Sequence, residues 1–376
     1  MTFDWHVYEC NYKKRLKNLT TSAKGVVKSD KFFPVFLEDN KEKVFKPLSK
    51  TKPLSTPYFA YSEVYWSTII NKYFDQNAPV YKLAICKNIE EEFENKYHHG
   101  TIVDSLESPE EKLVNLYEIF QSSPDPNVNI SDYINYCEQF YDYTSIFDSK
   151  LIKENQDLAN DLAKQILLSL LRLDQNYHYE NILFNQKDDT IISLAPPIDH
   201  EFSSMFLYLD SPQRHLSCIN NAVQNLTMPE ELIEALAIKN KTLSQEVIEK
   251  IAIAKYKQFA TLSLNLDKII LQCRDTSIEF LENLKHFIND LKQEPIVLED
   301  HGYLVPFSSD NYLIGHARYK KNNQLEAERL KNIIPQHNPD INVVNNMVNE
   351  ETLLTSQVLE TEIEKRLIKK ECKGVT

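Results

Sequence analysis

The sequence predicts an α+β protein built from two lobes, a small β-sheet lobe with one helix and a larger, mainly α-helical lobe. The first hundred residues contain short β-prone runs around one helical stretch. From Pro109 onward, apolar residues recur mostly at helical spacing. A hairpin pattern at 182–194 interrupts this helical part. We place the small lobe at residues 1–108, the large lobe at 109–300 and a mainly helical C-terminal extension at 301–376.

The small lobe is expected to be a sheet covered by one helix. Thr56 is a suitable N-cap and Pro57 a suitable first residue for that helix, which we extend to Tyr73. Glu38-Asp39-Asn40 is typical of a hairpin turn. The predicted strands are Val26-Val27, Phe32–Leu37, Lys43–Phe45, Val80–Cys86 and Thr101–Val103.

The large lobe is expected to be helical apart from its hairpin. The strongest helical pattern runs from Asn155 to Leu173, and the hairpin turns through Asn185–Asp189. Further helices are predicted at Glu110–Phe120, at Ile130–Phe140 and between Pro229 and Leu291.

The C-terminal extension begins with a polar stretch. Gln336–Asn349 is rich in asparagine and is predicted to be a linker. Leu353–Ile368 has the spacing of an amphipathic helix. We expect this helix to pack back onto the large lobe; binding of a protein partner is the alternative.

Composition excludes several classes of protein. With 5 Gly in 376 residues, a Gly-rich phosphate loop of the Rossmann or Walker type is not expected. The net charge of -13 argues against nucleic acid and anionic membranes as general partners. No apolar run is long enough to span a bilayer. The N-terminus lacks the pattern of a signal peptide, and the 6 Cys have no metal-binding spacing, as expected of reduced thiols in the cytoplasm.

Two charged residues of the small lobe suggest a phosphate-binding pair. Lys46 ends a predicted strand and Glu63 lies in the following helix. Enzymes of the protein-kinase type use a strand lysine to hold the α- and β-phosphates of ATP, and a helical glutamate to orient that lysine. The segment Leu19–Gly25 could cover the phosphates through backbone N–H groups and the hydroxyls of Thr21 and Ser22. An ordinary surface turn is the alternative for this segment.

The large lobe supplies the matching polar groups. The stretch LLRLDQNYHYENILF places His178 and Asn181 in a loop after a long helix, and Asp199 follows the hairpin. In kinases, a loop asparagine and a carboxylate after the next hairpin bind the Mg²⁺ that bridges the nucleotide phosphates. The order of these residues therefore predicts an ATP- and Mg²⁺-binding site.

These motifs resemble the HipA-type serine/threonine kinases, and more closely their shorter CtkA-type secreted relatives. VFKPLSKTKP with YSEVYWSTIIN is similar to the lysine and glutamate region, LLRLDQNYHYENILF to the catalytic loop and SLAPPIDHEFSS to the metal-binding segment. The similarity covers about residues 5–215. It implies a bilobal protein-kinase-like fold, Asn181 and Asp199 as Mg²⁺ ligands, and transfer of the γ-phosphoryl group to a protein hydroxyl. It also implies autophosphorylation, with Ser22 and its neighbours as candidate acceptors.

We place the hinge that would contact adenine at 102–106, which includes Asp104. The resemblance implies a cytoplasmic protein of bacterial type, with secretion as a toxin or effector left open. The identity of a protein substrate does not follow from the sequence.

The catalytic loop departs from the family pattern N-x-D-x-H-x-x-N. Here Asp174, Asn176, His178 and Asn181 fill those positions, so an amide replaces the expected catalytic aspartate. Losing a positioned general base costs about 10²–10⁴ in rate. Three interpretations stay open: Asp174 acts as the base, the protein is a slow kinase without a full base, or it is a nucleotide-binding pseudokinase that acts as an interaction module. Transfer of AMP by a kinase fold is a further alternative.

Overall fold

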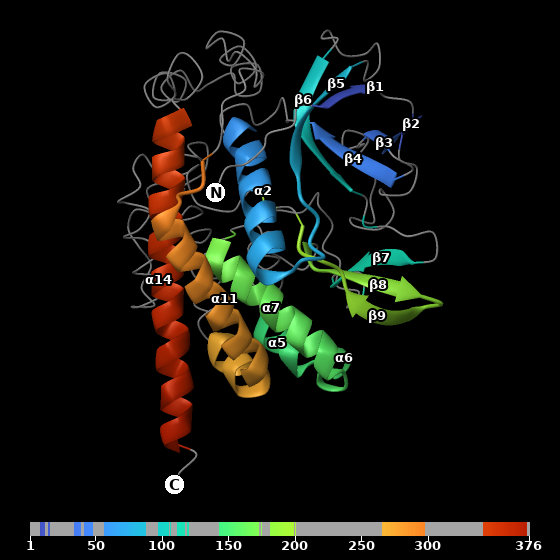
Figure 1. The fold of residues 1–376 in the computed structure, drawn as a ribbon. Helices are drawn as coiled ribbons and strands as arrows, with labels where there is room; N and C mark the ends of the chain where they lie inside the picture. Colours follow the sequence, from blue (N-terminus) through green and yellow to red (C-terminus); the bar gives the residue numbers. More distant parts are fainter. Residues whose placement is uncertain are drawn as a thin grey trace, which may run out of the picture. The chain divides into compact units, whose positions relative to one another are not determined.

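The computed structural model describes two compact units (Figure 1). The described residues are 8–11, 14–15, 34–38, 41–47, 56–87, 97–104, 106, 111–116, 119, 143–172, 174, 181–198, 200, 265–297 and 341–373. Unit 1 comprises Met1–Leu113, Ile198–Ser203 and Glu294–Asn349, and unit 2 comprises Val114–Pro197, Ser204–Gln293 and Glu350–Thr376. Helices and small sheets both occur, which confirms the mixed α+β class. The lobe boundaries near residues 108 and 300 stay predictions.

In the described part of unit 1, six strands form one sheet in the order β1-β5-β6-β4-β3-β2. β1 pairs with β5 in parallel and the other neighbours are antiparallel. Glu38 pairs with Lys41, as the predicted hairpin turn requires. The predicted strand at Val26-Val27 lies outside the described residues. The strands are β1 Tyr8–Asn11, β2 Lys14–Arg15, β3 Pro34–Glu38, β4 Lys41–Pro47, β5 Lys82–Lys87 and β6 Tyr97–Asp104.

One helix packs on this sheet against β5 and β6. It is α2, Thr56–Ile69, and it continues as the π-helical turn η1, Ile70–Phe74. The prediction of a helix from Thr56 to Tyr73 is therefore confirmed. The helix is apolar on most sides, since Val64, Tyr65, Trp66 and Ile69 are all buried. A helix with so wide an apolar surface is stable only inside a packed unit.

The described part of unit 2 is mainly helical. Asn155 caps the N-terminus of α7, because its Oδ1 accepts a hydrogen bond from the Leu158 N–H at 3.2 Å. The predicted helix at Asn155–Leu173 is thus confirmed, and its leucines form the core with α11. The helices are α5 Tyr143–Asp148, α6 Lys150–Lys153, α7 Gln156–Arg172, an unlabelled helix at 265–272, α11 Arg274–Gln293 and α14 Ile341–Lys373, which begins in unit 1.

A small sheet accompanies these helices, in the order β7-β8-β9. Its strands are β7 Lys112–Asn115, β8 Leu183–Lys187 and β9 Thr190–Leu194. The predicted hairpin is confirmed, but its turn is tighter than expected. Asp188 and Asp189 have φ angles of 47° and 60° and form a two-residue turn, which suits the twist of paired strands. Asn185 belongs to β8 instead, where its Nδ2 donates to Ser193 Oγ at 2.9 Å.

Two predicted elements are wrong. Glu110–Phe120 contains the strand β7 in place of a full helix, because the short apolar run around Leu113 fits a buried strand as well as a helix. Gln336–Asn349 is not a linker throughout, since α14 begins at Ile341. Asn349 donates to the Ile296 carbonyl at 2.6 Å and accepts from its N–H at 3.1 Å, and such tertiary contacts override weak helix propensity. The predicted helix at Ile130–Phe140 lies outside the described residues.

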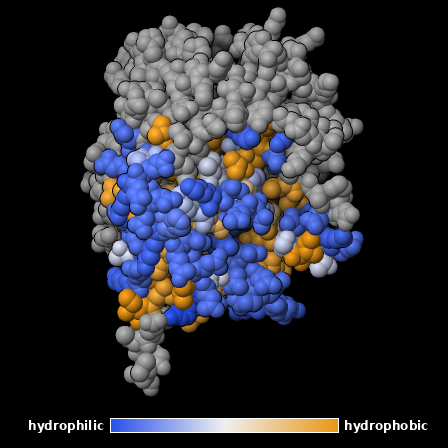
Figure 2. Space-filling model, in the orientation of Figure 1, coloured by the Kyte–Doolittle hydropathy of each residue, from blue (hydrophilic) through white to orange (hydrophobic). Residues whose placement is uncertain are grey.

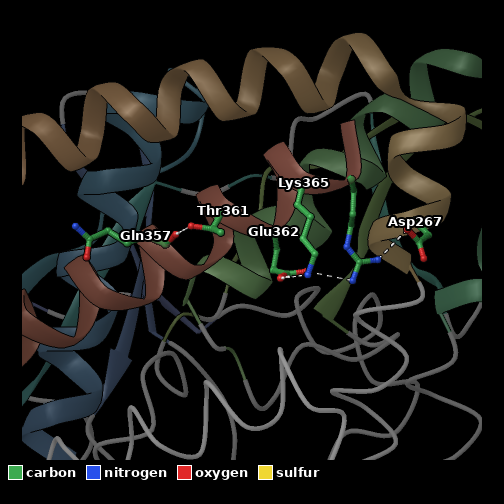
Figure 3. Close-up of polar contacts among 6 residues, drawn as sticks. Asp267, Gln357, Thr361, Glu362 and Lys365 are labelled. Carbon is green, nitrogen blue, oxygen red and sulfur yellow. Dashed lines mark hydrogen bonds and ion pairs between the residues drawn. The ribbon is translucent and has the colours of Figure 1, made fainter. Parts of the chain in front are cut away.

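The helix predicted at Leu353–Ile368 is confirmed as part of α14. Its positions Leu359, Ile363 and Leu367 are buried. Two ion pairs flank them: Arg366 Nη1 lies 2.8 Å from Asp267 Oδ1, and Lys285 Nζ lies 2.5 Å from Glu364 Oε1. Figure 3 shows the polar side of the helix, where Lys365 lies 3.6 Å from Glu362 and Thr361 donates to the Gln357 carbonyl. This part of α14 therefore packs on unit 2; partner binding stays a prediction.

The described surface is largely polar. On the face drawn in Figure 2, hydrophilic side chains cover most of the described residues and smaller apolar areas lie between them. Among the residues that the structure describes, the large apolar side chains that are exposed are Ile192, Leu271, Val297, Leu354 and Ile368. None of the helices within the described ranges combines the length and apolar character needed to cross a bilayer.

Cys273, between the 265–272 helix and α11, is a buried free thiol. Burial raises the pKa of this thiol from 9.0 to about 11. We expect Cys273 to resist iodoacetamide in the folded protein at pH 8 and to react fully in guanidinium chloride, as measured by mass spectrometry of its peptide. Labelling at the same rate in both conditions would contradict this.

The same shift gives a pH dependence of stability. Because the unfolded thiol ionises at lower pH than the folded one, the contribution of Cys273 is fully present below its unfolded pKa of 9.0. It is lost as the pH rises from there towards about 11. A Cys273→Ala variant should therefore show a weaker fall in stability across that window than the parent protein.

Candidate functional site

The predicted lysine and glutamate meet in unit 1. Lys46 Nζ, from the end of β4, lies 2.5 Å from Glu63 Oε1 of α2. The Glu63 side chain is 2% exposed and the Lys46 side chain 21% exposed. A buried carboxylate is strongly destabilising unless it is paired and hydrogen-bonded. Lys46 therefore neutralises a charge that α2 brings into the interior, while part of its own side chain stays accessible to solvent.

Glu63 accepts a second hydrogen bond from the sheet. Thr101 Oγ1 of β6 donates to Glu63 Oε2 at 2.7 Å, and Thr101 is itself buried. Thr101 pairs directly with Lys46 in the β4–β6 ladder, and directly paired residues place their side chains on the same face of a sheet. The two donors thus come from neighbouring strands, and each contacts a different oxygen of the same carboxylate.

The same helix contacts the segment around residue 200. The Ser62 hydroxyl donates to the His200 backbone carbonyl at 2.7 Å. The His200 ring is fully buried and lies edge-on to Tyr81, with 5.9 Å between the ring centroids. Ser62 precedes Glu63 in α2, and His200 follows Asp199 in the chain. The position of α2 is therefore linked to the residue after the predicted metal-binding carboxylate.

A second buried charge pair lies at the end of α7 in unit 2. Arg172 Nη2 is 3.0 Å from Asp174 Oδ2, and the two side chains are 0% and 1% exposed. The Asp174 N–H also donates to the Ser169 carbonyl at 3.0 Å, which fixes the backbone as it leaves the helix. Asn181, also buried, begins the chain segment that leads into β8. The Asp174 carboxylate is thus held by a guanidinium in the interior.

The remaining site predictions have mixed outcomes. Asp104 forms an ion pair with Lys43 across the β4–β6 ladder, and half of its side chain is exposed. Within the described ranges, no group of three or more His, Cys, Asp or Glu side chains could hold a metal ion. Five of the predicted residues lie outside the described residues: Thr21, Ser22, Asn176, His178 and Asp199.

Sequence reasoning missed Thr101, Arg172 and the contact between Ser62 and His200. Thr101 sits in a predicted strand, but its register against Lys46 depends on pairing between strands that lie far apart in the sequence. One sequence signal could have indicated Arg172: it is a basic residue in the last turn of a helix, where its charge interacts favourably with the helix dipole. That signal predicts a surface position, whereas Arg172 is buried.

Comparisons with known proteins give little guidance. No family model matches the chain, and no curated protein matches it. Among solved structures, the crystal structure of a Helicobacter pylori proinflammatory kinase, CtkA, is similar at 13% sequence identity and a TM-score of 0.33. The alignment covers 68% of this chain and 97% of that one. At such a TM-score the likeness supports no conclusion about this protein, so any function must be argued from its own residues.

Proposed function

We propose that this protein is an ATP- and Mg²⁺-dependent kinase with a bilobal protein-kinase-like fold that transfers the γ-phosphoryl group to a serine or threonine hydroxyl of a protein. The observation that carries this proposal is the contact between Lys46 and Glu63. A strand lysine held by a buried helical glutamate is the arrangement that kinases use to bind the α- and β-phosphates. The glutamate orients the amine, and the exposed part of the lysine remains available to the nucleotide.

The exposure of the Lys46–Glu63 pair suits the binding of a polyphosphate. Lys46 is partly exposed and Glu63 is fully covered, so an incoming anion meets the amine and not the carboxylate. Asn181 and Asp199 would hold Mg²⁺, which neutralises phosphate charge when bound. Asn181 provides an oxygen donor of the type that Mg²⁺ prefers. In the reaction, the acceptor oxygen bonds to the γ-phosphorus, the bond from that phosphorus to the β–γ bridging oxygen breaks to release ADP, and the hydroxyl proton passes to solvent.

The contact of Asp174 supports one of the open interpretations of the catalytic loop. The ion pair with Arg172 supports a structural role for Asp174, because a carboxylate engaged by a buried guanidinium is poorly placed to accept a substrate proton. With Asn176 at the expected aspartate position, the reaction would then proceed without a full base. A slow kinase is the form of the proposal that these contacts support best.

A nucleotide-binding pseudokinase is the second candidate. The pairing of Asp174 with Arg172 also supports this candidate. Between Arg172 and Asn181 the sequence has one further carboxylate, that of Glu180. Such a protein would bind ATP through Lys46 and act on a partner without transferring phosphate. Binding without turnover separates this candidate from the kinase.

The test replaces Lys46 with methionine in the full chain, with Lys82→Met as the matched control. Lys82 pairs with Ile102, the neighbour of Thr101, so its side chain lies on the opposite face of the same sheet. We expect Lys46→Met to lower transfer of the γ-phosphate about 10²–10³-fold, the usual effect of removing one preorganised electrostatic contact. Transfer of radiolabel from γ-labelled ATP to the protein itself or to a generic substrate measures it.

The outcomes separate the candidates. Loss of transfer in Lys46→Met with transfer retained in Lys82→Met supports the kinase, and equal transfer in Lys46→Met and the parent protein refutes it. Calorimetric ATP binding without any transfer points to the pseudokinase. Mass spectrometry of the product distinguishes an added phosphate from an added AMP.

A further inference from the structure

The oxygen of Glu63 that faces away from Lys46 is held by Thr101. Its Oε2 accepts from Thr101 Oγ1 at 2.7 Å, while Oε1 contacts Lys46 Nζ at 2.5 Å. Both Thr101 and Glu63 are buried, so water does not readily replace the hydrogen bond between them. A hydrogen bond to a charged group in such surroundings is stronger than a neutral one.

These contacts fix the orientation of the carboxylate plane. The terminal torsion of a glutamate is broad, so one partner alone leaves the second oxygen free to rotate. Thr101 is well suited to remove that freedom, because a β-branched side chain has few χ1 rotamers. Thr101 pairs with Lys46 of β4 on one side and with Leu83 of β5 on the other. Its backbone is therefore held by a neighbouring strand on each side.

We infer that Thr101 is a positioning residue for nucleotide binding, which acts on Lys46 through Glu63. This inference rests on the proposed function. Thr101 fixes one carboxylate oxygen, the other oxygen fixes the Lys46 amine, and the amine then meets the phosphates in a single orientation. Without the hydroxyl, Glu63 samples other rotations and the amine is less well aligned.

The experiment compares Thr101→Val, which keeps the shape and removes the hydroxyl, with Thr101→Ser, which keeps the hydroxyl. Calorimetry of ATP binding to the full chain is the readout. We expect Thr101→Val to weaken ATP binding about tenfold, as expected for loss of a hydrogen bond to a charged group. Thr101→Ser should bind within about threefold of the parent protein.

A double-mutant cycle tests whether the effect passes through the lysine. In a Lys46→Met background, Thr101→Val should cause no further loss of ATP affinity, because residues that act through one contact are not additive. An equal loss in both backgrounds, or no loss in Thr101→Val, overturns the inference. If Lys46→Met itself binds ATP as the parent protein does, the proposed function fails together with the inference. Thermal unfolding of each variant shows whether a change in affinity merely reflects a change in stability.

Discussion

Restoring a carboxylate at residue 176 is expected to speed up phosphoryl transfer. In the proposed kinase, Asn176 would stand where a catalytic aspartate is expected, and an amide cannot accept the proton of the substrate hydroxyl. A positioned general base contributes about 10²–10⁴ in rate. We therefore expect Asn176→Asp to raise the rate of transfer at saturating ATP by at least about 10². Single-turnover transfer from γ-labelled ATP measures this rate apart from product release.

The control must add the same charge elsewhere. Asn77 is exposed in the turn after η1 and lies outside the catalytic motif in the sequence, so Asn77→Asp adds the same charge without changing that motif. We expect no change in rate for this variant. If Asp174 already served as the base in the parent protein, Asn176→Asp would bring little gain in rate. An Asn176→Asp protein that binds ATP and still transfers nothing would leave the pseudokinase as the better description.

Breaking the ion pair between Arg172 and Asp174 is expected to cost much stability. Both side chains are fully buried, so Arg172→Met leaves a carboxylate without its guanidinium in the interior. Removing one partner of a buried pair costs about 3–5 kcal/mol. We expect the midpoint of urea unfolding to fall accordingly, with little change in the slope.

Two further variants make this test specific. Arg172→Met combined with Asp174→Leu should recover most of the loss, because apolar residues of similar volume replace a buried pair at little cost. Lys285→Met removes the pair with Glu364, whose side chains are 43% and 42% exposed. Glu364 raises the pKa of Lys285 by accepting its hydrogen bond, yet such a pair is worth about 0–1 kcal/mol because solvent screens it. Equal losses in Arg172→Met and Lys285→Met would show that burial is not the deciding factor.

The elements that the sequence predicted well are those with local signals. The capping residue Asn155 and the leucines after it mark α7 without reference to any other segment. The helix beginning at Thr56 and the hairpin around Asp188 and Asp189 likewise follow from nearby residues. β7 could not be predicted in this way, because a four-residue segment with only two apolar residues takes its conformation from the strand that it pairs with.

In the candidate site too, the residues with local sequence signals were predicted and those that depend on tertiary packing were not. Lys46 and Glu63 were found because a lysine ending a strand and a glutamate in the next helix form a recognisable order. Thr101 and Arg172 were not found, because hydroxyl and guanidinium groups occur throughout a sequence and only tertiary packing selects these two. Their partners lie in a buried interior, and burial depends on the whole fold.

Segments of the two units alternate along the chain, and this affects how the protein folds during its synthesis. Unit 2 buries Ile363 and Leu367 of α14, and unit 1 buries Ile296 and Val348, which lie in chain segments far from its strands. Ribosomes add about 5–20 residues per second, so the first strands wait on the order of ten seconds or more for these segments. Until those segments emerge, the apolar side chains that they cover are expected to stay exposed. Neither unit corresponds to one uninterrupted stretch of the gene, so a simple truncation of the chain would not isolate either one.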